Sequence, residues 1–153
     1  MNVDDPLVAH VTRNSFVMRL ATMSAAGHTS ITPLWFVVHE GRLIAGTAAS
    51  TVAVRNIRAD PRVTLLLDGE RAGPSAVVLR LRGDAEASNG LPPRRAMARL
   101  ATKYYLSVGG LRCELRNSRR WWLRQRYYSQ ADAAWIAIRP TSAEFLDLPA
   151  ARG

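Results

Sequence analysis

Residues 44–62 read IAGTAASTVAVRNIRADPR, and they are the most informative stretch of this chain. It predicts a strand over 42–48, a loop rich in small and hydroxyl residues, and a short helix over 52–59 that Asp60-Pro61 ends. The first turn of a helix leaves backbone N–H groups without intrahelical partners, and such groups bind anions. The stretch therefore predicts an anion site where the strand meets the helix.

Two strand-like runs precede this stretch, at 16–23 and 29–38, and a turn of sequence AAGH at 25–28 joins them. Both runs are rich in β-branched and aromatic residues, which is typical of a hairpin. A Glu-Gly turn at 40–41 then leads into the strand at 42–48. Together these segments predict the start of a small antiparallel β-barrel.

The rest of the chain predicts a few more elements. They are an N-terminal helix or arm (3–15), two strands (63–67 and 76–86), two helices (about 92–106 and 112–127), and a strand at 134–139 that Pro140 ends before an edge segment at 143–148. Six or seven strands that come mostly in hairpins predict a mainly β protein, an antiparallel barrel with inserted helices. The absence of GxGxxG and GxxxxGK[ST] motifs argues against a Rossmann or P-loop protein.

Length and composition indicate an ordinary globular protein. The chain has 153 residues, of which 48% are apolar and 22% charged, and this predicts a single domain over residues 1–153. The apolar runs are too short to span a bilayer and the N-terminus is unlike a signal peptide. We therefore expect a cytoplasmic protein that does not associate with a membrane. One cysteine, Cys113, excludes disulfide and thiolate zinc frameworks, and three scattered histidines predict no metal site.

The net charge of +9 comes almost entirely from arginine rather than lysine. It comes from 20 Arg and one Lys, Lys103, against 12 acidic residues. An anionic partner explains such a bias, and so does the codon usage of a GC-rich genome. Both explanations stay open at this point.

Four short motifs occur in order along the first half of the chain: LAT at 20–22, TPLWF at 32–36, GTA at 46–48 and VRNIRADPRV at 54–63. In this spacing they resemble the pyridoxamine 5′-phosphate oxidase-like, flavin-binding split β-barrels. The resemblance implies a homodimer whose cofactor sites lie at the subunit interface. It also implies an oxidoreductase that uses FMN or the deazaflavin coenzyme F-420 to transfer hydride to or from a small organic substrate. A minority of such proteins bind other ligands, such as haem.

A flavin needs a flat slot for its ring and an N–H-rich or positive pocket for its phosphate. We expect Thr32, Pro33 and Leu34 to line the slot, because a proline inside a strand marks an edge or a bulge. The alternative is that Pro33 only ends one strand pairing. Trp35 and Phe36 must face opposite sides of their strand, and we expect Trp35 in the core or a dimer interface. The flavin ring itself carries out hydride transfer, so no catalytic residue is named.

The loop after the third strand is the expected phosphate site. Thr47, Ser50 and Thr51 offer hydroxyl groups, and Ser50 or Thr51 is expected to cap the helix. Where relatives carry a basic residue just after the serine, this chain has Val52 and Ala53. The loss of a charge-assisted contact weakens binding by roughly 1.5–3 kcal/mol. The further candidates to contact the cofactor are Asn56 in the helix and, as substitute cations, Arg19, Arg55 or an arginine from the partner's 112–126 segment.

Residues 112–126, RCELRNSRRWWLRQR, carry six arginines and one glutamate. As a helix they place Arg116, Arg120 and Arg124 on one face. Three hypotheses follow: an amphipathic helix that packs on the barrel, a site for an anionic cofactor tail such as that of a polyglutamylated deazaflavin, or a nucleic-acid-binding surface, which is the weakest of the three. The rival to an oxidoreductase is therefore a catalytically inactive ligand-binding split barrel or a nucleic-acid-binding protein.

Overall fold

The computed structural model describes residues 3–68, 78–105 and 132–146. These residues form helices and strands in the order α1 (Pro6–Asn14), β1 (Val17–Met23), β2 (Thr29–Trp35), β3 (Val37–His39), β4 (Arg42–Ala48), α2 (Val52–Ala59), β5 (Arg62–Asp68), β6 (Val78–Asn89), α3 (Arg94–Tyr105) and β7 (Ala133–Leu146). The predicted second helix at 112–127, together with Cys113, lies outside the described residues.

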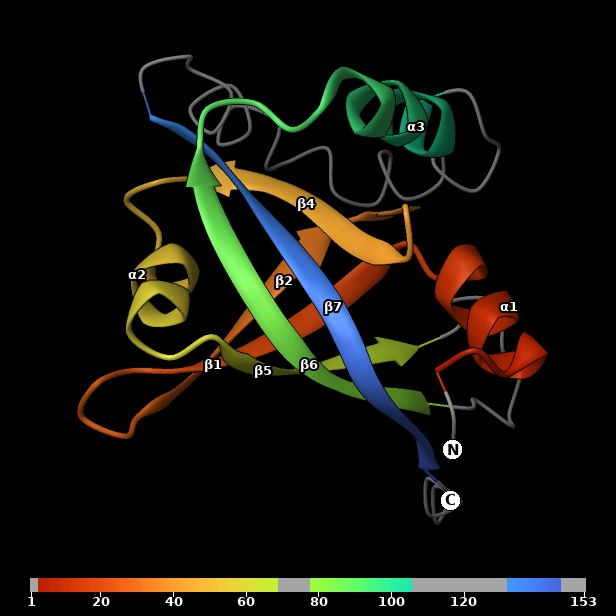
Figure 1. Cartoon of the computed structure of the whole chain (residues 1–153), viewed down its shortest axis with the longest axis horizontal. Coiled ribbons are helices and arrows are strands. Elements are labelled where there is room, and N and C mark those ends of the chain that lie inside the picture. The colour runs from red at the N-terminus through yellow and green to blue at the C-terminus, as the bar shows by residue number, and fades with distance from the viewer. Residues whose placement is uncertain (1–2, 69–77, 106–131, 147–153) are drawn as a thin grey trace, which may run out of the picture.

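The strands form one antiparallel sheet in the order β2-β1-β5-β6-β7-β4-β3. The long strands β6 and β7 cross the molecule diagonally, with α2 on one side, α1 on the other and α3 across the top (Figure 1). The sheet curls strongly around its inner face, and this confirms the predicted mainly β split barrel with a short helix that follows the Arg42–Ala48 strand.

The core lies inside the curl, because alternate residues of each strand point to it. Met18 and Leu20 of β1, Leu65 of β5 and Leu79 of β6 are all fully buried. Each such side chain stabilises the fold by roughly 1.5–3 kcal/mol. Helix α2 adds Val54 to the same core, so the position of this helix is fixed by packing.

The run at 29–38 was expected to be one strand, but the structure breaks it at Phe36. Strand β2 pairs with β1, whereas β3 pairs with β4, so the two halves belong to opposite edges of the sheet. Phe36 is fully buried at the crossing point. The break leaves its backbone groups outside the ladder, and they need partners from elsewhere in the chain.

The expectation that Pro140 ends the last strand is wrong, because β7 runs unbroken from Ala133 to Leu146. The ladder with β6 shifts register beside Pro140, which lacks an N–H group: Gly83 pairs with Pro140, and the residue before Gly83 pairs with Ser142. A side chain at Gly83 would collide with the carbonyl group of Arg139. Glycine at this one position therefore lets the strand continue.

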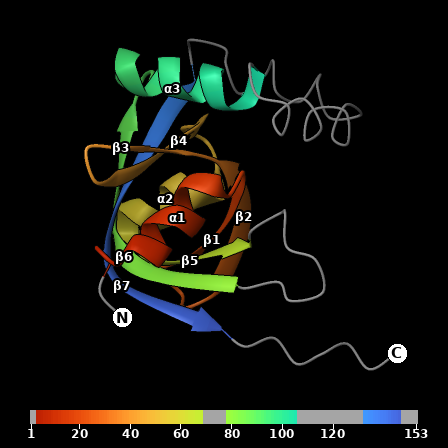
Figure 2. The ribbon, with the colours of Figure 1, turned by 90° about the vertical axis from the view of Figure 1, so that its right-hand side faces the viewer.

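The three described helices cover different parts of the sheet. Asp5 caps α1 by accepting a 2.8 Å hydrogen bond from the Leu7 N–H, and Pro6 occupies the first turn. Figure 2 shows α3 across one end of the sheet, above β3 and β4. Ala96 of α3 packs there on Val37 and Ile44 in a second, smaller cluster. None of the described helices is both long enough and apolar enough to cross a membrane.

Candidate functional site

The junction of β4 and α2 carries the hydroxyl groups that the sequence singled out. The Thr51 hydroxyl donates to the Ala48 carbonyl oxygen at 2.8 Å and lies 3.4 Å from that of Thr47. Thr51 occupies the N-cap position of α2, but its side chain makes no capping hydrogen bond. The Ser50 hydroxyl donates to Asp132 at 2.6 Å, just before β7. Because these hydroxyls are engaged elsewhere, they leave the first N–H groups of α2 uncapped.

The two positions that lack the basic residue differ in their surroundings. Val52 is 42% exposed at the start of α2, whereas Ala53 is completely buried against the core. A cation at position 53 would be desolvated, and a cation at position 52 would reach solvent beside the helix start. Only position 52 is therefore suited to an exposed phosphate anchor.

Farther along α2, two predicted contacts face in different directions. Asn56 is 2% exposed, and its amide group donates to the hydroxyl of Thr22 in β1 at 3.1 Å. This contact joins the helix to the first hairpin. Arg55 is exposed. The structure thus uses Asn56 to position α2 and leaves Arg55 at the surface.

The predicted slot residues lie on β2, which forms one edge of the sheet. Thr32 and Leu34 are half-buried on one face, while Pro33 is exposed on the other face, opposite Arg19 of β1. Ile31, on the same outer face as Pro33, is 66% exposed. The strand therefore divides the predicted trio, with Thr32 and Leu34 toward the barrel and Pro33 toward solvent.

Two residues of α3 bond to the backbone of Phe36, where the strand is interrupted. Neither was predicted as a site residue. The Tyr104 hydroxyl accepts the Phe36 N–H at 2.9 Å and lies within hydrogen-bond distance of the carbonyl oxygens of Phe16 and Phe36. Its ring stacks on Trp35, with centroids 4.3 Å apart. Trp35, which was expected in the core or a dimer interface, is half-buried against α3, and Phe36 lies in the core.

The second of these residues is Lys103, beside the same break. Its ammonium group donates to the carbonyl oxygens of Ser15 at 2.6 Å and Phe36 at 3.2 Å, and lies 4.2 Å from the centroid of the Phe36 ring. Burial lowers the pKa of Lys103 to about 8. One signal was available in the sequence: this is the only lysine in a chain with 20 arginines.

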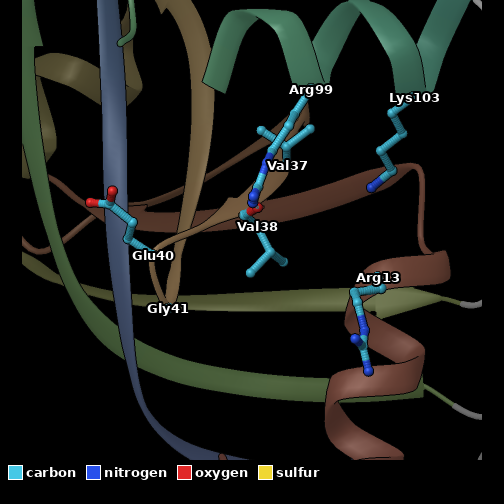
Figure 3. A pocket seen from close by; sticks show the side chains of 7 residues that line it. All are labelled: Arg13, Val37, Val38, Glu40, Gly41, Arg99 and Lys103. Carbon is cyan, nitrogen blue, oxygen red and sulfur yellow. The ribbon is translucent and has the colours of Figure 1, made fainter. Parts of the chain in front are cut away.

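Lys103 also borders a pocket of about 420 Å³ between α1, β3, the β3–β4 turn and α3. Figure 3 shows its lining, which includes three basic side chains, the aliphatic residues of β3 and the turn: Arg13, Arg99, Lys103, Val37, Val38, Glu40 and Gly41. A second pocket, of about 570 Å³, lies on the other side of the turn, against Trp135 and the start of α3. Both pockets lie apart from the β4–α2 junction.

Metal ligation finds no support in the described part of the chain, where no three His, Cys, Asp or Glu residues come together. His39 lies 3.7 Å from Glu40, a contact within one turn. The β4–α2 junction offers backbone N–H groups and hydroxyls, which are groups that bind anions.

A family model described as pyridoxamine 5′-phosphate oxidase matches residues 5–147. The chain belongs to this family. Membership in the pyridoxamine 5′-phosphate oxidase family agrees with the curled antiparallel sheet and with the strand, loop and helix at the β4–α2 junction. It does not name a substrate, because one fold hosts many reactions. No curated protein sequence matches the chain.

Solved structures share the fold at low sequence identity. A haem storage protein, HutZ from Vibrio cholerae, has a TM-score of 0.64 at 13% identity and covers 96% of this chain and 95% of its own. An F-420 reductase has a TM-score of 0.61 at 19% sequence identity, and the match covers 88% of this chain and 94% of the reductase. An FAD-binding protein from Mesorhizobium loti has a TM-score of 0.60 at 17% sequence identity, and the match covers 95% of each chain. At these identities the likeness shows the fold alone.

Proposed function

We propose that the protein is an oxidoreductase that binds FMN or coenzyme F-420 and transfers hydride to or from a small organic substrate in the cytoplasm. Family membership supports a flavin-type ligand, and the solved structures of the same fold include a protein named F-420 reductase and another named FAD-binding.

The observation that carries this proposal is the uncapped start of α2. Thr51 stands at the N-cap but bonds to Ala48, so the first N–H groups of the helix remain open to a phosphate. Val52, the next residue, is partly exposed and leaves room beside these groups. The residues at the junction therefore fit the phosphate end of such a cofactor.

The outer face of the β1–β2 hairpin supports a homodimer. Ile31 is 66% exposed and lies two residues from the exposed Pro33 on the same face, and Met23, nearer the hairpin turn, is 43% exposed. Large apolar side chains gathered on one sheet face mark an interaction surface. Arg19 lies on the same face, in register with Pro33, and would bring a positive charge to that interface.

When bound, the flavin or deazaflavin ring would supply the hydride chemistry. This chain would supply the binding groups. The first N–H groups of α2 would hold the phosphate, and the half-buried Thr32 and Leu34 would border the ring. Asn56, through its bond to Thr22, would keep α2 and the hairpin in fixed relation.

A second candidate is a barrel of this family that binds a ligand without catalysis. The neutral residues Val52 and Ala53 favour it, because the junction then lacks a charge-assisted anchor. A solved structure of the same fold is that of a haem storage protein, and this supports ligand binding as the alternative. The third hypothesis, nucleic-acid binding through 112–126, concerns residues outside the described part.

The deciding experiment is a fluorescence titration of the purified protein with FMN and with oxidised and reduced F-420. We expect micromolar or tighter binding of one cofactor, and a dimer by sedimentation. A Thr32→Tyr variant, which fills the proposed ring position, should abolish binding, whereas the control Thr102→Tyr at an exposed position of α3 should not. Failure of the parent protein to bind any of the three would overturn the oxidoreductase proposal.

A further inference from the structure

Helix α3 has an unusual charge distribution. Its sequence, RRAMARLATKYY, contains four basic residues and no acidic one. Arg94 and Arg95 lie in its first turn, where the helix dipole disfavours positive charge. Arg99 and Lys103 follow one and two turns later, toward the pocket that α3 shares with β3 and α1. The helix therefore brings cations to this region at a cost to its own stability.

Glu40, the acidic residue that lines the pocket, lies 3.7 Å from His39. Within the described residues, neither Arg13 nor Arg99 forms an ion pair. Arg99 donates instead to the Val38 carbonyl oxygen at 2.9 Å, and Arg13 donates to the Ala9 carbonyl oxygen at 3.2 Å. The Glu40 side chain is 79% exposed and extends away from the cations (Figure 3). The pocket is therefore positively charged and walled by aliphatic groups.

The cations are also spread along the pocket. Arg99 and Lys103 come from successive turns of α3, whereas Arg13 comes from α1 on the opposite wall (Figure 3). Between them lie Val37 and Val38 of β3. Separate cations with an aliphatic surface between them match a ligand that has two negative groups joined by a short apolar chain.

We propose that this pocket is a second ligand site and that it binds a small aliphatic dicarboxylate. One carboxylate would lie between Arg99 and Lys103, and the other would reach Arg13. The methylene groups would contact Val37 and Val38. The site is separate from the β4–α2 junction and does not depend on the proposed cofactor.

A compact phosphate ion fits this arrangement less well, because it can contact only part of a dispersed set of cations. A monocarboxylate leaves one end of the set without a counter-charge. Lys103 provides a supporting observation, since burial lowers its pKa to about 8 and a bound carboxylate would raise it again. Dicarboxylate binding should therefore be coupled to proton uptake near pH 8.

The single lysine makes the test direct. Lysine labelled with carbon-13 at its ε position gives one side-chain NMR signal for the whole protein, that of Lys103. The full-length protein is titrated with glutarate at constant ionic strength, and separately with butyrate and with inorganic phosphate. We expect a saturable shift with glutarate, at least tenfold weaker binding of butyrate and phosphate, and a higher pKa of Lys103 in the glutarate complex.

Two variants locate the site. Arg99→Gln should weaken glutarate binding by about tenfold or more, because one charge-assisted contact is lost. Arg58→Gln serves as the matched control, since Arg58 is an exposed helical arginine outside the pocket that bonds to Asn89, and it should bind like the parent. Circular dichroism establishes that both variants fold. No saturable shift with glutarate, equal binding of butyrate or phosphate, or unchanged affinity in a folded Arg99→Gln variant would each overturn the proposal.

Discussion

The β4–α2 junction and the α3 pocket are both suited to anions, but they are built from different parts of the chain. The junction offers backbone N–H groups and, among its own residues 47–53, no basic side chain. The pocket offers three basic side chains from α1 and α3. A site made from the start of one helix is local and can be recognised in sequence. A site made from side chains of distant elements appears only once the chain is folded.

The largest change in stability is expected on the pocket side, when Tyr104 of α3 is truncated. Tyr104→Ala removes the stacked ring and leaves the Phe36 N–H without its partner, so we expect a loss of about 3–5 kcal/mol in the free energy of unfolding, measured with urea. The neighbouring Tyr105→Ala, 58% exposed, should lose less than about 1 kcal/mol. Similar losses in the two variants would show that α3 does not hold the break at Phe36.

The next largest effect is on the pH dependence of stability, and it arises from Lys103 beside the pocket. The folded protein holds Lys103 with a pKa near 8, below the ordinary value of 10.5, so the unfolded chain binds that proton more tightly. The stability of the parent should therefore rise by roughly 2–3 kcal/mol between pH 8 and 10.5 relative to Lys103→Met. Urea unfolding of both proteins across this range measures the difference. Parallel pH profiles would mean that Lys103 is not desolvated in the folded state.

At the junction, a gain of function should be obtained by restoring a cation. Val52→Arg places a guanidinium at the exposed start of α2 and should tighten FMN or F-420 binding about tenfold. The neutral control Val52→Gln should bind like the parent. The gain should shrink as salt increases, because the contact is electrostatic. An equal gain in both variants would show that charge at this position is irrelevant.

The smallest effect should come from Thr51, because its hydroxyl bonds to Ala48 and does not cap α2. Thr51→Ala should reduce the free energy of unfolding by roughly 0.5–1 kcal/mol, less than many lost caps. The same urea measurement provides the value, with Thr29→Ala on β2 as the control for an exposed hydroxyl. A loss of 2 kcal/mol or more would indicate that Thr51 does cap the helix in solution.

Much of the fold could be predicted because its signals are local. Turn residues at 25–28 and 40–41, and the helix at 52–59, follow from short motifs and occur where they were expected. The continuation of β7 through Pro140 could not be predicted, because it depends on Gly83 in another strand. The break at Phe36 depends in the same way on Tyr104, which is 68 positions away in the sequence.

The candidate site shows the same limit. The hydroxyl loop was recognisable, yet the actual partners of Thr51 and Asn56 depend on how β1, β4 and α2 pack. Whether Val52 or Ala53 is exposed was also undetermined until the helix was seen against the core. Lys103 had a compositional signal as the sole lysine, but its contacts join α3 to Ser15, after α1, and to Phe36, between β2 and β3.

The most direct test of two separate anion sites is an amide NMR titration of one protein sample, first with FMN or F-420 and then with glutarate. The cofactor should shift the amide signals of Thr51 to Val54 at the start of α2 and leave those around Val38 and Arg99 unchanged, and glutarate should do the reverse. If both ligands shift the same signals, or the cofactor leaves the start of α2 unaffected, the assignment of the junction as the cofactor site is contradicted.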